Sequence, residues 1–309
     1  MAPSTPTHDI AGRTVLVTGG AGFVGSPLVE ALLPANTVWV LDDLSAGDRT
    51  AVPDGAHLVV GDVRDRPLVA SLVARADVVF HQAAVVSVER SVAAPVETHA
   101  VNATATLELL EAARESDTRV VLASSAAVYG RPESVPQSED DRLAPESPYG
   151  VAKLAADRYA RVYASLYDLP TVALRYFNVY GPPPAGSDTP PGVIGSFLRS
   201  VRAGEPIRVH GDGSQTRDFV HVRDVVRANL AAATTDSVGR AFNVGTGESV
   251  SIASLANLVR DAAGGAEVVH TDAREGDVDH SRADTTAARD LLGFEAGVGP
   301  EEGVRALLE

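Results

Sequence analysis

An apolar, β-branched run at residues 13–18 leads directly into a loop with glycines at positions 19, 22 and 25, and residues 27–33 after it have helical spacing. A strand, a glycine loop and a helix in this order present the N–H groups and dipole of a helix N-terminus to a negative charge. Glycine lets the backbone approach that charge closely. A GxxGxxG spacing alone is weak evidence. In this setting it predicts a pyrophosphate-binding turn at the start of an α/β fold.

Five further strand-like runs follow at residues 37–41, 57–60, 76–80, 119–123 and 171–174, and an amphipathic helix is expected at 104–114. Apolar strands that alternate with helices are typical of a parallel sheet covered on both faces. We therefore predict an α/β fold with a Rossmann-like, doubly wound parallel sheet.

The character of the sequence changes near Gly181, where proline- and glycine-rich loop stretches begin and shorter elements follow. We predict a dinucleotide-binding Rossmann domain over 1–180, with 1–10 as a loose tail. A smaller C-terminal α/β substrate lobe is expected over 181–309, from which about 214–240 return to the first domain.

Two carboxylates follow predicted strands of the first domain. Asp42 ends the second strand, where it can accept hydrogen bonds from the ribose hydroxyls of an adenosine. Its charge would repel a 2′-phosphate, so NAD is favoured over NADP. Asp62 follows the third strand, where an adenine would lie, although a turn aspartate explains this residue almost as well.

Residues 147–153, SPYGVAK, have the pattern of a helix start, with Ser147 as N-cap and Pro148 in the first turn. Tyr149 and Lys153 then lie one turn apart on the same face. A neighbouring ammonium favours the phenolate and lowers the pKa of a tyrosine from about 10 toward neutrality, which makes it a usable acid/base. The alternative is a surface tyrosine beside a solvated lysine. Lys153 is the only lysine among 26 Lys and Arg residues, however, and this indicates a role that a guanidinium cannot fill.

Ser124 and Ser125 follow the fifth predicted strand, at the carboxyl edge of the sheet where ligands bind in such folds. A hydroxyl in this place can hydrogen-bond a reacting hydroxyl group and relay its proton. A Ser-Ser pair by itself is more often simply the end of a strand.

The composition excludes several classes of partner. The net charge is −15, which disfavours nucleic acid and anionic membrane, and an anionic substrate would need a local group of arginines. No apolar run approaches the roughly 18 residues of a membrane span. The chain has no cysteine, which excludes disulfides and thiolate metal sites and is compatible with the cytoplasm. We expect no metal, no membrane and a cytoplasmic location.

With these residues assembled, the chain resembles the extended short-chain dehydrogenase/reductase family, and within it the NAD-dependent nucleotide-sugar epimerases. The resemblance runs from about residue 13 to the C-terminus. Its stretches are TGGAGFVG (18–25), GDVRD (61–65), HQAA (81–84), SSAAVYG (124–130), SPYGVAK (147–153), LRYFNVYGP (174–182), GDGSQTRDFVHVRDVVRA (211–228), FNVGTG (242–247) and REGDV (274–278).

The resemblance implies a role for individual residues. The catalytic residues would be Ser125, Tyr149 and Lys153. NAD would be bound by Gly19, Gly22, Phe23, Val24, Gly25, Asp42, Asp62, Val63, Ala83, Ala84, Asn102, Ser124, Tyr149, Lys153 and Phe177. The substrate, a UDP-sugar, would contact Ser87, Ser125, Asn178, Val193, Arg217, Arg274, Asp277 and Ser281, with the two arginines on the nucleotide and its diphosphate. The resemblance also implies a homodimer.

Two departures narrow the reaction. Ala126 and Ala127 stand where the family's dehydratases carry Asp-Glu, so 4,6-dehydration is disfavoured, and a glutamate usual in the decarboxylases is also absent. Ser281 stands where the epimerases line the hexose pocket, and a small residue there admits an N-acetyl group. The expected activity is C4 epimerisation of UDP-glucose or UDP-galactose and of the N-acetylhexosamine forms. The alternatives are a UDP-glucuronate 4-epimerase, another nucleotide-sugar oxidoreductase, and a non-catalytic NAD-binding sensor.

Overall fold

Seven parallel strands form the central sheet of the computed structural model, which describes residues 10–187, 190–273 and 278–308. In spatial order the strands are β11 (Arg240–Val244), β6 (Thr171–Tyr176), β5 (Arg119–Ser125), β4 (Val78–His81), β1 (Thr14–Thr18), β2 (Thr37–Asp42) and β3 (His57–Val60). The chain runs outward from β1 in one direction to β3 and then returns to build β4, β5 and β6 on the other side. The strand order therefore reverses between β1 and β4, which is the place where such sheets bind ligands.

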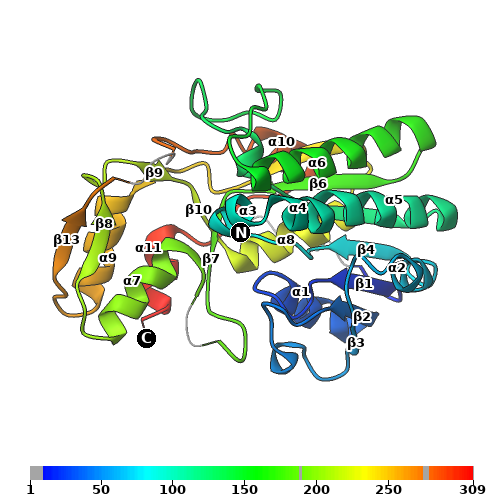
Figure 1. The fold of residues 1–309 in the computed structure, drawn as a ribbon, viewed down its shortest axis with the longest axis horizontal. Helices are drawn as coiled ribbons and strands as arrows, with labels where there is room; N and C mark the ends of the chain where they lie inside the picture. Colours follow the sequence, from blue (N-terminus) through cyan, green and yellow to red (C-terminus); the bar gives the residue numbers. More distant parts are fainter. Residues whose placement is uncertain (1–9, 188–189, 274–277, 309) are drawn as a thin grey trace, which may run out of the picture.

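Helices cover both faces of this sheet (Figure 1). One face carries α1 (Gly25–Leu32), α8 (Val222–Thr234) and α10 (Thr286–Leu292), and the other carries α2 (Arg66–Val73), α5 (Ala105–Ser116) and α6 (Pro148–Tyr167). Two short helices, α3 (Val88–Ala93) and α4 (Pro95–His99), and a π-helical turn (Ala100–Thr104) lead from β4 into α5. The predicted doubly wound α/β fold is confirmed.

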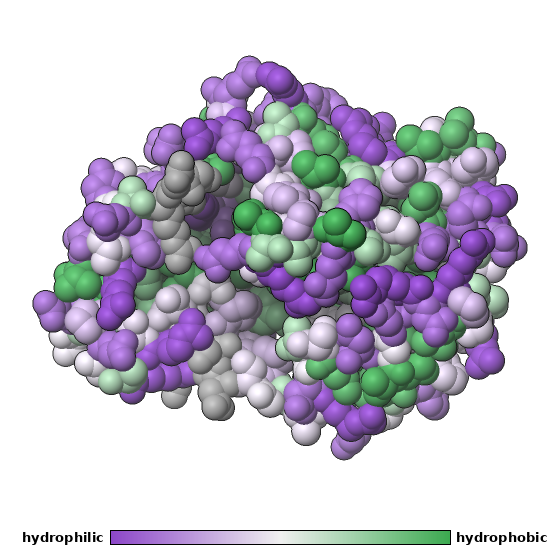
Figure 2. Space-filling model, in the orientation of Figure 1, coloured by the Kyte–Doolittle hydropathy of each residue, from purple (hydrophilic) through white to green (hydrophobic). Residues whose placement is uncertain are grey.

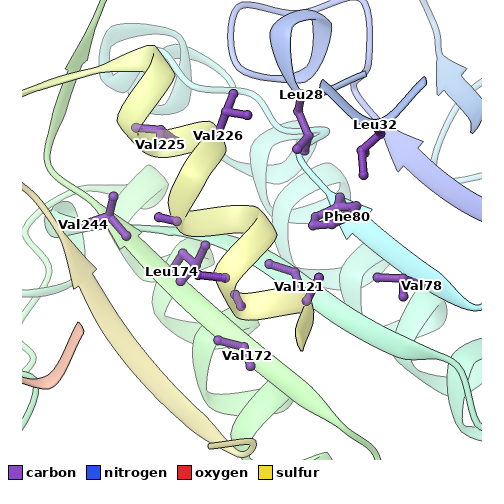
Figure 3. Close-up of a cluster of buried hydrophobic side chains, with 14 of the residues drawn as sticks. Leu28, Leu32, Val78, Phe80, Val121, Val172, Leu174, Val225, Val226 and Val244 are labelled. Atoms are coloured by element: carbon purple, nitrogen blue, oxygen red, sulfur yellow. The ribbon is translucent and has the colours of Figure 1, made fainter. Parts of the chain in front are cut away.

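The strands hold the two layers together because their side chains alternate between the faces. Val78 and Phe80 of β4 pack with Leu28 of α1 and Val225 of α8 in one cluster, which Figure 3 shows beneath α8. Val79, between them, belongs to the cluster on the other face, with α2, α5 and α6.

A smaller lobe lies beside the sheet, at the left of Figure 1. It contains α7 (Gly192–Arg202), α9 (Ile252–Ala262), α11 (Pro300–Ala306) and the parallel pair β8 (Ile207–His210) and β13 (Val268–Thr271), around a core of its own. Two further strand pairs are β7 (Asn178–Tyr180) with β10 (Phe219–His221), and β9 (Thr216–Arg217) with β12 (Val250–Ser251). Three 3-10 turns complete the described elements: Leu33–Ala35, Arg49–Ala51 and Ala126–Val128.

The late part of the chain contributes to both regions. Within 214–240, α8 packs on the sheet, and β11 follows it as a seventh strand that the six predicted runs did not include. The domain limits at 180 and 181 stay a prediction. No helix in the described part of the chain is both long and apolar enough to span a membrane.

Candidate active site

The glycine loop after β1 is folded so tightly that side chains are excluded from it. A Cβ atom on Gly25 would lie 2.0 Å from the Gly19 carbonyl oxygen, and one on Gly19 would lie 2.6 Å from the backbone nitrogen of Ala83. Gly19 has a φ of +71°, in the left-handed region that favours glycine. No side chain caps the first N–H groups of α1, for which Val24 is the N-cap residue. The loop thus forms a narrow cradle that ends at a helix N-terminus without a side-chain cap, as suits an anionic ligand.

Asp42 lies against this loop at the end of β2. One carboxylate oxygen accepts a hydrogen bond from Ala21 N (2.9 Å) and the other from Leu44 N (2.9 Å), and the residue is 8% exposed. Each oxygen keeps a further acceptor position for a ligand hydroxyl. Asp62 is different, because Arg64 Nε donates to both of its carboxylate oxygens at 3.0 Å and holds its pKa below the usual value. Its neighbour Val63 is buried in the core beneath α2.

The start of α6 is built as the sequence predicts. Ser147 caps the helix by accepting a hydrogen bond from Gly150 N (3.1 Å), and Pro148 occupies the first turn. Tyr149 and Lys153 follow at a separation of one turn. The Lys153 ammonium is buried and donates to Ala123 O of β5 at 2.8 Å, and burial lowers its pKa to about 8.

Tyr149 meets Ser125 at the end of β5. Burial raises the pKa of the Tyr149 phenol, and a hydrogen bond with Ser125 acts in the opposite direction. In the chain alone the pKa of Tyr149 is therefore raised, where a lowering toward neutrality by Lys153 was expected. Ser125 Oγ also accepts from Ala127 N at 3.2 Å.

The geometry of these residues agrees with the similarity of the whole chain to known proteins. Residues 15–245 match the NAD dependent epimerase/dehydratase family. The chain belongs to this family. It is 40% identical to a UDP-glucose 4-epimerase of Mycolicibacterium smegmatis over 306 residues, which cover 95% of this chain and 97% of the relative.

Two solved structures of similar proteins superpose on nearly the whole chain. One is a UDP-glucose 4-epimerase of Thermotoga maritima with UDP-glucose, with a TM-score of 0.91 and 35% identity over 96% of this chain and 97% of that one. The other is a UDP-N-acetylglucosamine 4-epimerase of Methanobrevibacter ruminantium with UDP-N-acetylmuramic acid, with a TM-score of 0.91 and 34% identity over 97% and 98%.

The cofactor of the epimerase/dehydratase family is NAD, and the loops at the strand-order reversal fit it. The glycine cradle ends at a helix N-terminus without a side-chain cap, which suits a pyrophosphate, and Asp42 offers acceptors to a ribose. Phe23, Ala83 and Ala84 are half-buried beside this cradle, and Asn102, Ser124 and Phe177 are buried. The individual contacts of these residues with NAD stay predictions.

The predicted substrate residues lie along the joint between the sheet and the small lobe. Ser125 pairs in register with Tyr176 of β6, and Asn178 N, two residues further on, donates to Asp218 O at 3.0 Å. Asp218 follows Arg217, and Ser281 N donates to Thr216 O at 3.1 Å. One continuous path of backbone contacts thus connects Ser125, Asn178, Arg217 and Ser281.

The positions of the other predicted substrate residues, and the side chain of Arg217, are as follows. Ser87 is exposed and caps α3 by accepting from Arg90 N, and Val193 packs on the core of the small lobe. Arg217 is half-buried and donates to Thr216 O at 2.8 Å. Arg274 and Asp277 lie outside the described residues. No group of three or more His, Asp or Glu side chains suited to a metal ion occurs in the described part of the chain.

The sequence analysis missed a buried polar network behind the predicted catalytic residues. Ser124 Oγ donates to Asp157 at 2.8 Å, and Arg175 forms a two-pronged ion pair with the same carboxylate. Arg175 also donates to the hydroxyl group of Tyr129, which donates to Asn243. The spacing of Asp157, one turn after Lys153 on the same helix face, is the signal that could have placed it near the site.

Proposed function

We propose that this chain inverts C4 of a UDP-hexose through a transient 4-keto sugar, with NAD bound throughout. The observation that carries this proposal is the contact of Tyr149 with Ser125, with Lys153 one turn further along α6. Ala126 and Ala127, at the dehydratase positions, supply no acid or base. Proton transfer at one hydroxyl group is therefore the chemistry that the site supports.

The side chains divide the work as follows. Tyr149, assisted by Ser125, takes the proton of the sugar 4-hydroxyl group and holds it on the phenol oxygen. Bound NAD supplies a hydride acceptor for C4 and, in its oxidised form, a positive charge. Because burial raises the pKa of Tyr149 in the chain alone, positive charge from the cofactor and from Lys153 is needed to favour the phenolate. The keto sugar would then turn about its diphosphate linkage, so that C4 regains the hydride from the reduced cofactor on its opposite face and Tyr149 returns the proton to the oxygen atom on C4.

The substrate class follows from the relatives and from local charge. The Thermotoga maritima structure contains UDP-glucose, and the Methanobrevibacter ruminantium structure contains a UDP-linked N-acetyl sugar. A residue as small as Ser281 would admit an N-acetyl group, so UDP-glucose, UDP-galactose and their N-acetylhexosamine counterparts are proposed substrates. Arg217, together with Arg274, would bind the diphosphate, since a guanidinium matches phosphate oxygens.

A homodimer is part of the proposal. Apolar side chains of α3, α4 and α6 remain exposed: Val92 is 64%, Val96 82% and Leu166 66% exposed. Figure 2 shows apolar groups over these three helices on one face of the molecule. A second copy of the chain would remove this surface from water, which favours association. We also place the enzyme in the cytoplasm, in agreement with its lack of cysteine.

The test is to separate UDP-glucose and UDP-N-acetylglucosamine from their 4-epimers by anion-exchange chromatography after incubation with the purified protein. The parent is compared with Tyr149→Phe and with Tyr159→Phe, a control on the same helix whose side chain is 39% exposed. We expect both sugars to be converted, and Tyr149→Phe alone to lose about 10²–10⁴-fold in kcat. If neither sugar is converted, UDP-glucuronate is incubated in the same way: its conversion would replace this proposal with the uronate epimerase, and NAD binding without any conversion would favour a sensor.

A further inference from the structure

His81, the last residue of β4, is a buried titratable group that the proposed reaction does not use. It is 2% exposed and points to the face of the sheet that carries α5, whereas Phe80, the residue before it, packs in the cluster on the other face. Its Nδ1 lies 2.7 Å from Thr18 Oγ1 of β1, and its Nε2 lies 2.9 Å from Thr106 Oγ1 of α5. Both ring nitrogens therefore have a hydroxyl partner.

The neighbouring hydrogen bonds allow only one tautomer of this ring. The Thr106 hydroxyl donates its single proton to Asn102 O at 2.9 Å, so it can only accept from His81. Nε2 must then carry the proton, and Nδ1 must accept the proton of the Thr18 hydroxyl group. Thr18 Oγ1 in turn accepts from Ala83 N at 3.3 Å. Every polar hydrogen in this chain of groups has an acceptor when His81 is neutral and protonated on Nε2.

This network joins the three segments that form the cofactor side of the site. Thr18 directly precedes the glycine loop, and the network fixes Ala83 in the loop after β4, where Gly19 and Ala83 are in close contact. At the other end, Asn102 in the π-helical turn exchanges two 2.8 Å hydrogen bonds with the backbone of Val85. π-helical turns are rare and are frequently found at functional sites.

We propose that His81, in its neutral Nε2–H form, is a positioning residue for NAD that fixes the glycine loop, the Ala83–Val85 loop and the π-helical turn relative to one another. It deepens the proposed function, but it concerns cofactor binding and holds whichever sugar is the substrate. Thr18 and Thr106 orient the imidazole, and the imidazole sets the distance between β1, β4 and α5 at their ligand-binding ends. Loss of either hydroxyl group leaves a buried ring nitrogen without a hydrogen-bond partner. The three segments would then no longer be held in fixed positions relative to one another.

The chain offers a matched control for this idea. Thr118 is as buried as Thr106, at 2% exposure each, and its hydroxyl group also lies within hydrogen-bonding distance of backbone carbonyl groups, at the opposite, amino end of β5. Thr106→Val and Thr118→Val remove the same hydroxyl group from equally buried sites. Thr106→Ser keeps the hydroxyl group and completes the set.

The experiment is titration calorimetry of NAD into cofactor-depleted protein, with thermal unfolding of each variant without NAD. We expect Thr106→Val to raise the Kd for NAD about tenfold, equal to about 1.4 kcal/mol, and Thr118→Val and Thr106→Ser to stay within about twofold of the parent. A parent-like Kd in Thr106→Val, or an equal rise in Thr118→Val, would overturn the proposal. Because no sugar is present, failure of the epimerase proposal does not affect this outcome.

A second measurement reads the tautomer directly. In ¹⁵N spectra of the histidine side chains, with His81→Gln used to assign the resonance, we expect His81 to carry its proton on Nε2 and to stay neutral between about pH 5 and 8. A proton on Nδ1, or a charged ring at about pH 6, would contradict the assignment.

Discussion

Arg175 and Asp157 form an ion pair in which neither side chain is exposed, with Arg175 Nε 3.0 Å from one carboxylate oxygen and the second nitrogen 3.2 Å from the other. The same carboxylate accepts a hydrogen bond from Ser124, next to Ser125, the predicted catalytic serine. Arg175 lies on β6, directly before Tyr176, Phe177 and Asn178. The pair therefore connects the two strand ends that carry the catalytic serine and the predicted substrate residues.

Loss of this arginine should cost far more than loss of an exposed one. Arg175→Met leaves the Asp157 charge buried without its main partner, and we expect the free energy of unfolding to fall by about 3–5 kcal/mol. Arg161 also approaches Asp157, at 4.0 Å, but its side chain is 35% exposed, so Arg161→Met should cost less than about 1 kcal/mol. Urea unfolding of both variants checks the difference. An equal decrease in the free energy of unfolding in both variants would show that the buried ion pair contributes no more to stability than the exposed one.

The pH dependence of stability should reveal His81. Burial, and to a lesser extent the charge of Lys153, lowers the pKa of His81 from 6.5 to about 3. Between these values only the unfolded chain binds the proton, so stability is complete above about pH 6.5 and falls by about 1.4 kcal/mol for each unit below it. Unfolding in urea at about pH 7 and 5 should show a loss of about 2 kcal/mol from this residue, which His81→Gln removes. An unchanged loss in that variant would refute the assignment, and the exposed His99→Gln serves as control.

Lys153 should lower the stability of the protein while it supports catalysis. Its pKa falls from 10.5 to about 8 on burial, so between these values the unfolded chain binds more protons and stability rises with pH. At about pH 7 the buried ammonium costs about 3 kcal/mol, partly offset by its hydrogen bond to Ala123. Lys153→Met should therefore raise the melting temperature of the NAD-free protein at about pH 7, lose that advantage at about pH 10, and lose activity. A lower melting temperature at the neutral pH would contradict this.

Local signals in the sequence predict the strands well where an apolar run coincides with the strand. The run 57–60 is identical with β3, whereas the run 119–123 stops two residues before the end of β5. Ser124 and Ser125 continue that strand because they pair with Arg175 and Tyr176 of β6. This pairing depends on a strand about fifty residues later in the chain. The Ser-Ser pair is polar, so it gives no apolar pattern from which the end of the strand could be predicted.

The site shows the same division. The Ser147 cap and the spacing of Tyr149 and Lys153 are local, and the sequence predicts them. The contacts behind the site are not local in the sequence. Strand β11 joins the sheet beside β6, and Arg175 of β6 forms its ion pair with Asp157 of α6. In a sequence with 26 Lys and Arg residues, no local signal distinguishes a buried arginine from an exposed one. The direction of the Lys153 ammonium, toward Ala123, also depends on packing that spacing alone does not define.

The exposed apolar row on α3, α4 and α6 gives a test of the dimer. Val96 is 82% exposed on α4, and Val96→Glu would place a charge in the proposed contact between copies. We expect analytical ultracentrifugation to show a dimer for the parent and a larger share of monomer for this variant. Leu291→Glu, on α10 with 41% exposure, should leave the dimer intact. A monomeric parent would remove the homodimer from the proposal.

The glycine cradle gives the sharpest test of cofactor binding by the backbone. A methyl group on Gly25 would lie 2.0 Å from Gly19 O and 2.7 Å from the Cα of Gly20, all backbone atoms that cannot move aside singly. Gly25→Ala must therefore displace the loop, and we expect a loss of NAD affinity of at least about 100-fold, equal to about 2.7 kcal/mol. Gly299→Ala, where no atom lies within 4 Å of the added methyl group, should bind NAD like the parent. Calorimetric titration with NAD separates the two, and tight binding by Gly25→Ala would mean that the pyrophosphate lies elsewhere.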